Sequence, residues 1–164
     1  MNPVIKTIAE KKFIGKRLRM TFAEDKTHLL WKSFMPKRKE IDHQLTSDLY
    51  CLQVYAHAHD FSFFKADAEF YKWAAVEVSD FNIVPTDMET IILKGGLYAV
   101  FNHIGAASEG HNTFWYIFER WLPESNYNID NRIHFEVLGD KYKNNDPTSE
   151  EEVWIPIKPK IAVV

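Results

Sequence analysis

The sequence predicts an α+β fold made of two copies of one strand–helix–strand–strand unit, related by a pseudo-twofold axis. The chain has 164 residues, which suits a single domain spanning 1–164. The same order of strand and helix patterns occurs in residues 10–80 and again in residues 95–157, and each helix pattern ends at a proline. We therefore expect an antiparallel sheet covered by two main helices, with a central ligand cleft where the units meet.

The first half contains one amphipathic helix pattern. Asp25 or Thr27 can cap it, because either side chain can accept a hydrogen bond from a free backbone N–H of the first turn. Pro36 limits it, since proline lacks a backbone donor and disfavours helix in the residue before it. Runs rich in β-branched and aromatic residues predict strands at 12–21, 48–56 and 70–78.

The second half repeats this order. Four apolar residues form the i, i+3, i+4, i+7 stripe of an amphipathic helix: Phe114, Ile117, Phe118 and Trp121. Pro123 is expected to end this helix. Strands are predicted at 97–104, 132–138 and 151–157, and we expect eight strands in all. Pro156 indicates an edge position or a strand end, because proline cannot donate to a sheet ladder.

Composition limits the classes of function. The net charge is −3, from 20 basic and 23 acidic residues, so binding to DNA by net electrostatic attraction is not expected. Cys51 is the one cysteine, which excludes an internal disulfide and favours a reducing, cytoplasmic location. There is no signal-peptide pattern and no apolar stretch near the roughly 18 residues of a membrane span. Aromatic residues make up 15%, so some rings are expected to line a binding site.

Two other patterns do not predict a cofactor. His57-x-His59-Asp60 resembles part of a metal site, but a metal needs three or four converging ligands, and neither Cys-x-x-Cys nor His-Glu-x-x-His is present. Gly95-Gly96 does not match a phosphate-binding loop, and the serines lack a Gly-x-Ser-x-Gly context. We therefore expect no metal and no cofactor.

Four motifs of the second half occur in a characteristic order. They are Tyr98-Ala99-Val100-Phe101-Asn102-His103-Ile104-Gly105, Trp121-Leu122-Pro123-Glu124-Ser125-Asn126-Tyr127, Phe135-Glu136-Val137 and Glu152-Val153-Trp154-Ile155-Pro156-Ile157. This series resembles the GyrI-like small-molecule-binding domain, also known as the effector-binding domain of AraC-type and MerR-type transcription regulators. The resemblance is strongest from Gly95 to Ile157 and rests on element order over residues 10–80.

The resemblance implies a central cleft for lipophilic, often cationic, compounds. Regulators of this class carry a helix-turn-helix domain ahead of the effector domain, whereas about ten residues precede the first predicted strand here. We therefore expect a stand-alone module that binds a small hydrophobic, aromatic or cationic compound, for ligand sensing, sequestration or protection against drugs and toxins. Direct DNA binding and membrane contact are not expected, and a protein partner stays open.

Glu152 and Trp154 are the leading candidates for the ligand site. Strand alternation places both on one face and Val153, Ile155 and Ile157 on the other, where they suit packing against a helix. A carboxylate beside an indole can hold a cation by charge and by cation–π attraction. The resemblance implies that the glutamate of the Glu-x-x-x-Pro motif is the electrostatic anchor of the pocket. The alternative for Glu152 is a solvated strand residue.

Tyr71 and Trp73 occupy the matching positions of the first half, so we expect them to face Glu152 and Trp154 across the pseudo-axis. Their alternative is the common one for strand aromatics, which is half-burial in a sheet without contact to a ligand. Glu136 is favoured as a surface strand residue over a pocket acid.

Two further functions stay open through the resemblance. Some stand-alone members of the family hydrolyse cyclopropane-bearing toxins with a pocket glutamate, and Glu152 would be the catalytic residue of such an enzyme, as a general acid or base. The family is named after a member that inhibits DNA gyrase by protein contact, so a gyrase-inhibitor-like interaction module is the other alternative.

Overall fold

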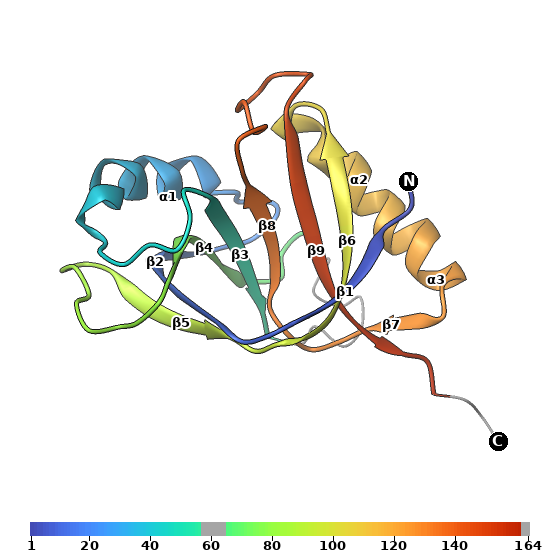
Figure 1. The fold of residues 1–164 in the computed structure, drawn as a ribbon. Coiled ribbons are helices and arrows are strands. Elements are labelled where there is room, and N and C mark those ends of the chain that lie inside the picture. Colours follow the sequence, from blue (N-terminus) through green and yellow to red (C-terminus); the bar gives the residue numbers. More distant parts are fainter. Residues whose placement is uncertain (57–64, 162–164) are drawn as a thin grey trace.

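The strands of the chain form one antiparallel sheet (Figure 1). The structure is a computed structural model that describes residues 1–56 and 65–161, and within these ranges the sheet has nine strands. The strands are β1 (Val4–Ile8), β2 (Lys11–Met20), β3 (Leu49–Tyr55), β4 (Phe70–Val78), β5 (Glu89–Leu93), β6 (Gly96–Ile104), β7 (Tyr127–Ile129), β8 (His134–Leu138) and β9 (Glu150–Pro159). They stand in the order β1-β6-β9-β8-β3-β4-β2-β5, and β7 pairs with β9 beside this path.

Two helical rods accompany the sheet. The first is α1 (Thr27–Phe34), which continues as a 3₁₀ helix (Met35–Glu40) that contains Pro36. The second begins with a 3₁₀ turn (Ala107–Glu109) and runs through α2 (Gly110–Tyr116), a π-helical turn (Ile117–Trp121) and α3 (Leu122–Glu124). Pro123 lies inside α3, so this rod ends one residue after the proline that was expected to stop it.

The strand order is symmetric about its centre. β3 and β8 pair in the middle, and outward from them come β4, β2 and β5 on one side and β9, β6 and β1 on the other. Two copies of one unit related by a pseudo-twofold axis produce this order, which confirms the predicted fold class. The sequence patterns did not place β1, β5 and β7, and the structure has nine strands where eight were expected.

Each half of the chain contributes an edge strand to the part of the sheet formed by the other half. β1 directly precedes β2 in the chain but pairs with β6, and β5 directly precedes β6 but pairs with β2. The chain therefore passes from one half to the other between β1 and β2 and again between β5 and β6. These two connections are in contact. A Cβ on Gly95 would lie 2.4 Å from the carbonyl oxygen of Ile8 and 2.9 Å from the carbonyl carbon of Ala9, so this approach requires glycine.

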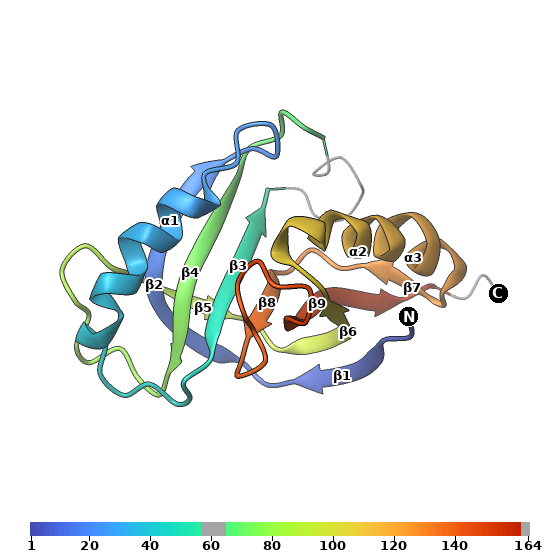
Figure 2. The ribbon, with the colours of Figure 1, turned by 90° about the horizontal axis from the view of Figure 1, so that it is seen from above.

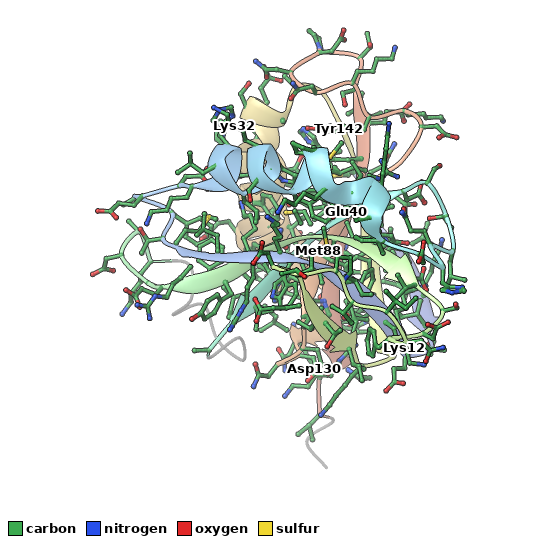
Figure 3. The ribbon with its side chains drawn as sticks, turned by 90° about the vertical axis from the view of Figure 1, so that its left-hand side faces the viewer. Lys12, Lys32, Glu40, Met88, Asp130 and Tyr142 are labelled. Atoms are coloured by element: carbon green, nitrogen blue, oxygen red, sulfur yellow. The ribbon has the colours of Figure 1, made fainter. Side chains whose placement is uncertain are left out.

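Both helical rods cover the same side of the sheet (Figures 1 and 2). Leu30 and Phe34 of α1 are buried in a cluster with residues of β2 and β4, which include Ile14 and Val76. In Figure 3 this rod runs across the strands from Lys32 towards Glu40. The second rod buries its own apolar stripe in a separate cluster over β6 and β9, with Ile117, Phe118 and Leu122 against Phe101, Val153 and Ile155.

A third core lies on the opposite side of the sheet and joins the two halves. Its buried members are Phe13, Tyr50, Leu52, Trp73, Ala75, Leu93, Tyr98, Val100, Phe135, Val137 and Trp154. The strand register aligns four of them in one row across the centre: Trp73, Leu52, Phe135 and Trp154. The rings of Phe135 and Trp154 stack with centroids 5.0 Å apart. Since both halves supply this core, neither half can bury it alone.

The position of Pro156 differs from the expectation of an edge or a strand end. It lies in β9, an inner strand, opposite Tyr98 of β6. On the other side of β9, pairing with β8 ends at Trp154 and pairing with β7 begins at Ile157. Pro156 therefore falls in the gap between β8 and β7, where a missing N–H interrupts neither ladder.

None of the helices within the described residues is long and apolar enough to cross a membrane.

Replacing Gly15 by alanine should destabilise the fold. A Cβ at this position would lie 2.1 Å from the carbonyl oxygen of Ala74 and 2.7 Å from the Cα of Ala75, so β2 and β4 would have to separate. We expect a loss of about 1–3 kcal/mol in the free energy of unfolding, measured by urea denaturation. Gly110→Ala is the control, because nothing lies within 4 Å of its Cβ and alanine favours helix. Equal stability of Gly15→Ala and wild type would contradict the packing described here.

Candidate functional site

The four residues predicted from the sequence lie on the side of the sheet away from the helices. Trp73 and Trp154 belong to the core that joins the halves and are only 5% and 7% exposed. Glu152 is half-buried, and its Oε1 accepts a hydrogen bond of 3.2 Å from the indole Nε1 of Trp154. Tyr71 is also half-buried. The carboxylate and the indole expected to hold a cation are thus side by side.

The chain already supplies cations to these rings. The Nζ of Lys6 lies 5.5 Å from the ring centroid of Trp154, and the guanidinium carbon of Arg17 lies 4.4 Å from that of Tyr71. Trp73 and Trp154 lie in one row across the strands. Tyr71 lies on one side of this row, in register with Val54, and Glu152 lies on the other side, in register with Val137. Contact of the four residues with a ligand stays a prediction.

The helix side of the sheet carries a group of polar residues at its centre. We call Cys51, Gln53, Lys72, Glu136 and Glu151 the central strip. None of the five belongs to the apolar cluster under α1 or to the one under α2. Figure 2 shows β3 and β8 running between the two helical rods. The strip therefore lies on the pseudo-twofold axis, where a ligand cleft was expected.

The register of the strands brings these side chains together. Cys51 pairs directly with Glu136, and Gln53 pairs directly with Lys72. Glu136 is opposite Val153, so Glu151 is its diagonal neighbour on the same face. Diagonal neighbours on one face lie about 7–8 Å apart at the backbone, which long side chains can bridge. The two carboxyl groups do bridge it and hydrogen-bond to each other.

A hydrogen bond between two carboxyl groups requires a proton, because an ionised carboxylate has no donor. Burial raises the pKa of Glu136, against the opposing charges of Lys72 and His103. Burial, together with the neighbouring Glu136, also raises the pKa of Glu151 to about 8. The pair consequently holds one shared proton near neutral pH, at a position that is only half-exposed. The sequence argument favoured Glu136 as a surface residue, and the structure places it here instead.

Polar groups with fixed orientations flank the pair on both sides. On the α1 side, the Nζ of Lys72 donates a hydrogen bond of 2.7 Å to the hydroxyl of Thr27. On the α2 side, the buried His103 ring contacts the Ala106 carbonyl at 3.2 Å through Nε2 and the Thr113 hydroxyl at 2.6 Å through Nδ1. A carbonyl only accepts, so Nε2 donates to Ala106, and Nδ1 bonds the hydroxyl of Thr113, which can donate or accept.

The pseudo-twofold axis relates Gln53 to Glu136. Leu52 of β3 and Phe135 of β8 pair at the centre, and each also pairs with a tryptophan on its outer neighbour, so the axis relates Leu52 to Phe135. The residues that follow them in the chain, Gln53 and Glu136, are then equivalent as well. The Nε2 of Gln53 lies 3.5 Å from Oε1 of Glu136 and 3.3 Å from the sulfur of Cys51. Burial raises the pKa of the Cys51 thiol well above its usual range, so the thiol stays protonated and unreactive.

Glu151 was missed because it stands in a run of three glutamates that looks like a solvated segment. The signal was present in the alternation, which puts Glu151 on the same face as Val153 and Ile155, the face that packs against a helix. The predicted exclusion of a metal concerned His57, His59 and Asp60, which lie outside the described residues.

Comparison with known proteins identifies the family. The family model described as the GyrI-like small molecule binding domain matches residues 1–158. The chain belongs to this family. The match confirms the resemblance read from the four motifs and extends it over the first half. The family match supports small-molecule binding by this GyrI-like domain.

Individual relatives agree with this assignment. The transcriptional regulator BrlR of Pseudomonas aeruginosa is 27% identical over 133 residues, which cover 78% of this chain and 45% of BrlR. The GyrI-like domain thus spans less than half the length of this relative. Its fold is similar to the C-terminal domain of EcmrR (TM-score 0.71, 18% identity, 96% and 98% of the two chains). It is also similar to SAV2435 bound to tetraphenylphosphonium (TM-score 0.66, 14% identity, 96% and 94%).

Replacing Glu151 by glutamine should flatten the pH dependence of stability. Because its pKa is raised on folding, the folded state holds more protons than the unfolded chain between pH 4.5 and 8, and wild-type stability falls as pH rises through this window. Glu151→Gln keeps the shape and removes this titration. Allowing for its partial exposure, we expect the variant to gain about 1–2 kcal/mol relative to wild type between pH 5 and pH 8, or roughly 2–8 °C in Tm.

Thermal unfolding at pH 5 and pH 8 measures this difference. The exposed Glu119 on the second rod provides the baseline, since Glu119→Gln removes the same charge far from the strip. If the Tm difference between Glu151→Gln and wild type is the same at both pH values, the carboxyl pair does not hold a proton.

Proposed function

We propose that this GyrI-like domain binds lipophilic monocations at the central strip, in a role of ligand sensing or sequestration. The observation that carries the proposal is the Glu136–Glu151 carboxyl pair, which lies half-buried on the axis between the two units. A half-buried acidic pair needs a reason to persist, because replacing it by apolar residues would remove a desolvation penalty. Attraction of a cationic ligand supplies that reason.

The surroundings of the pair support an amphipathic ligand. The apolar clusters under the two helical rods border the strip from either side, and Tyr55 and Phe114 pack at the edge of the cluster under α2. Gln53 and Thr27 offer neutral polar groups next to the charged ones. A ligand with aromatic rings around one positive charge fits this combination. SAV2435, which shares the fold, binds tetraphenylphosphonium, a cation of this kind.

Titration with tetraphenylphosphonium at pH 8 tests the proposal. We expect Glu136→Gln and Glu151→Gln to weaken binding by about 1.5–3 kcal/mol, or roughly 10- to 150-fold in Kd, since each removes a charge that the cation faces. Triphenylphosphine oxide, a neutral compound of similar shape, should bind both variants and wild type alike. Isothermal titration calorimetry measures all six combinations of protein and compound.

Glu152 provides the matched comparison, because it neighbours Glu151 in the chain and points to the opposite face of β9. If the ligand binds at the central strip, Glu152→Gln leaves the Kd for tetraphenylphosphonium within about twofold. If Glu152→Gln weakens binding and Glu151→Gln does not, the ligand binds beside Trp154, as the sequence predicted. Failure of tetraphenylphosphonium to bind wild type at millimolar concentration would refute the proposal.

Hydrolysis is a second candidate function, favoured by the same proton. A carboxyl group that stays protonated near neutral pH can act as a general acid, and the Glu136–Glu151 pair has this property. Incubation with an electrophilic cyclopropane, followed by mass spectrometry, distinguishes turnover from binding. Consumption that depends on Glu151 would support the enzyme, and recovery of the unchanged compound would leave binding alone.

A further inference from the structure

The charges of the central strip balance before any ligand enters. With one shared proton, the Glu136–Glu151 pair carries one negative charge, and Lys72 on β4 carries one positive charge. Asp25 also interacts with Lys72, but it is exposed and its charge is screened by water. A monocation added to this half-buried group would leave it with a net positive charge, which is unfavourable where water is partly excluded.

We propose that a bound monocation displaces the proton shared by Glu136 and Glu151, so that binding is an exchange of one cation for one proton. The inference rests on the proposed function and names how the same site is regulated. The bond that breaks is the carboxyl O–H of the pair, the proton leaves to solvent, and the positive charge of the ligand then offsets the second carboxylate. Charge balance is the same before and after.

The other groups facing the pair do not supply this proton. From β3, burial raises the pKa of Cys51 and of Tyr55 far above neutral, and both stay protonated. From the connection before β9, burial likewise raises the pKa of Tyr142, which Figure 3 labels on the helix side. On β8, burial lowers the pKa of His134 to about 3, so its ring is neutral.

His103 of β6 also faces the pair, because it is paired directly with Glu151 of β9. Its Nε2–H is donated to the carbonyl of Ala106, and its Nδ1 meets the hydroxyl of Thr113. Because Glu151→Gln removes the carboxyl of Glu151 and keeps Glu136 and His103, any proton exchange that remains in this variant comes from a group other than Glu151. The variant therefore separates Glu151 from the other groups.

Calorimetry with tetraphenylphosphonium tests the exchange, because the charge of this probe does not change with pH. Titrations at pH 6.5 in buffers of different ionisation enthalpy count the protons released per bound cation. We expect about one proton from wild type and close to none from Glu151→Gln. The affinity of wild type should rise about tenfold per pH unit below pH 7.5 and level off above the pKa of Glu151, near 8, whereas that of Glu151→Gln should stay constant.

Two controls complete the design. Triphenylphosphine oxide should release no proton, because it brings no charge, and the exposed Glu119→Gln variant should release the same proton as wild type. Tetraphenylphosphonium binding without proton release, or equal release from Glu151→Gln, would overturn the exchange and leave the proposed function standing. Absence of any binding would overturn the proposed function and the exchange with it.

Discussion

The contact between the β1–β2 connection and the β5–β6 connection constrains the whole molecule. At Gly95 the chain passes against the backbone of Ile8 and Ala9 with no room for a side chain. Because β1 and β5 are exchanged there, each half completes the sheet of the other, and the core of Trp73, Trp154 and their neighbours is closed from both ends. The pairing of β3 with β8 at the centre joins the same two halves, and it brings Cys51 and Gln53 of the central strip next to Glu136.

Local patterns were sufficient for most of the fold. Both helices and six strands follow from apolar periodicity and from the two prolines, which act within a few residues of themselves. β1 and β5 are short, and their partners lie in the opposite half, so no local pattern indicates them. β7 has three residues and exists because β9 extends beyond β8.

The candidate site was less accessible from the sequence. Alternation assigned Glu152 and Trp154 to one face and Val153 and Ile155 to the other, and the structure has them so. Which face remains open to a ligand depends on how both halves fill the core, and that is a property of the assembled sheet. The meeting of Glu136 with Glu151 likewise depends on the register between β8 and β9, which side-chain order along one strand does not specify.

The relation between Gln53 and Glu136 has a consequence for any assembly with this architecture. Two identical chains that exchanged their first strands would form the same sheet around a true twofold axis, and the two positions nearest that axis would have to hold the same side chain. Two ionised glutamates there would repel each other, and two glutamines would leave the centre without charge. Joining both units in one polypeptide removes the restriction, so that an amide can face an acid across the axis. The covalently linked form of this fold can thus encode an asymmetry at the centre that a dimer of identical chains cannot.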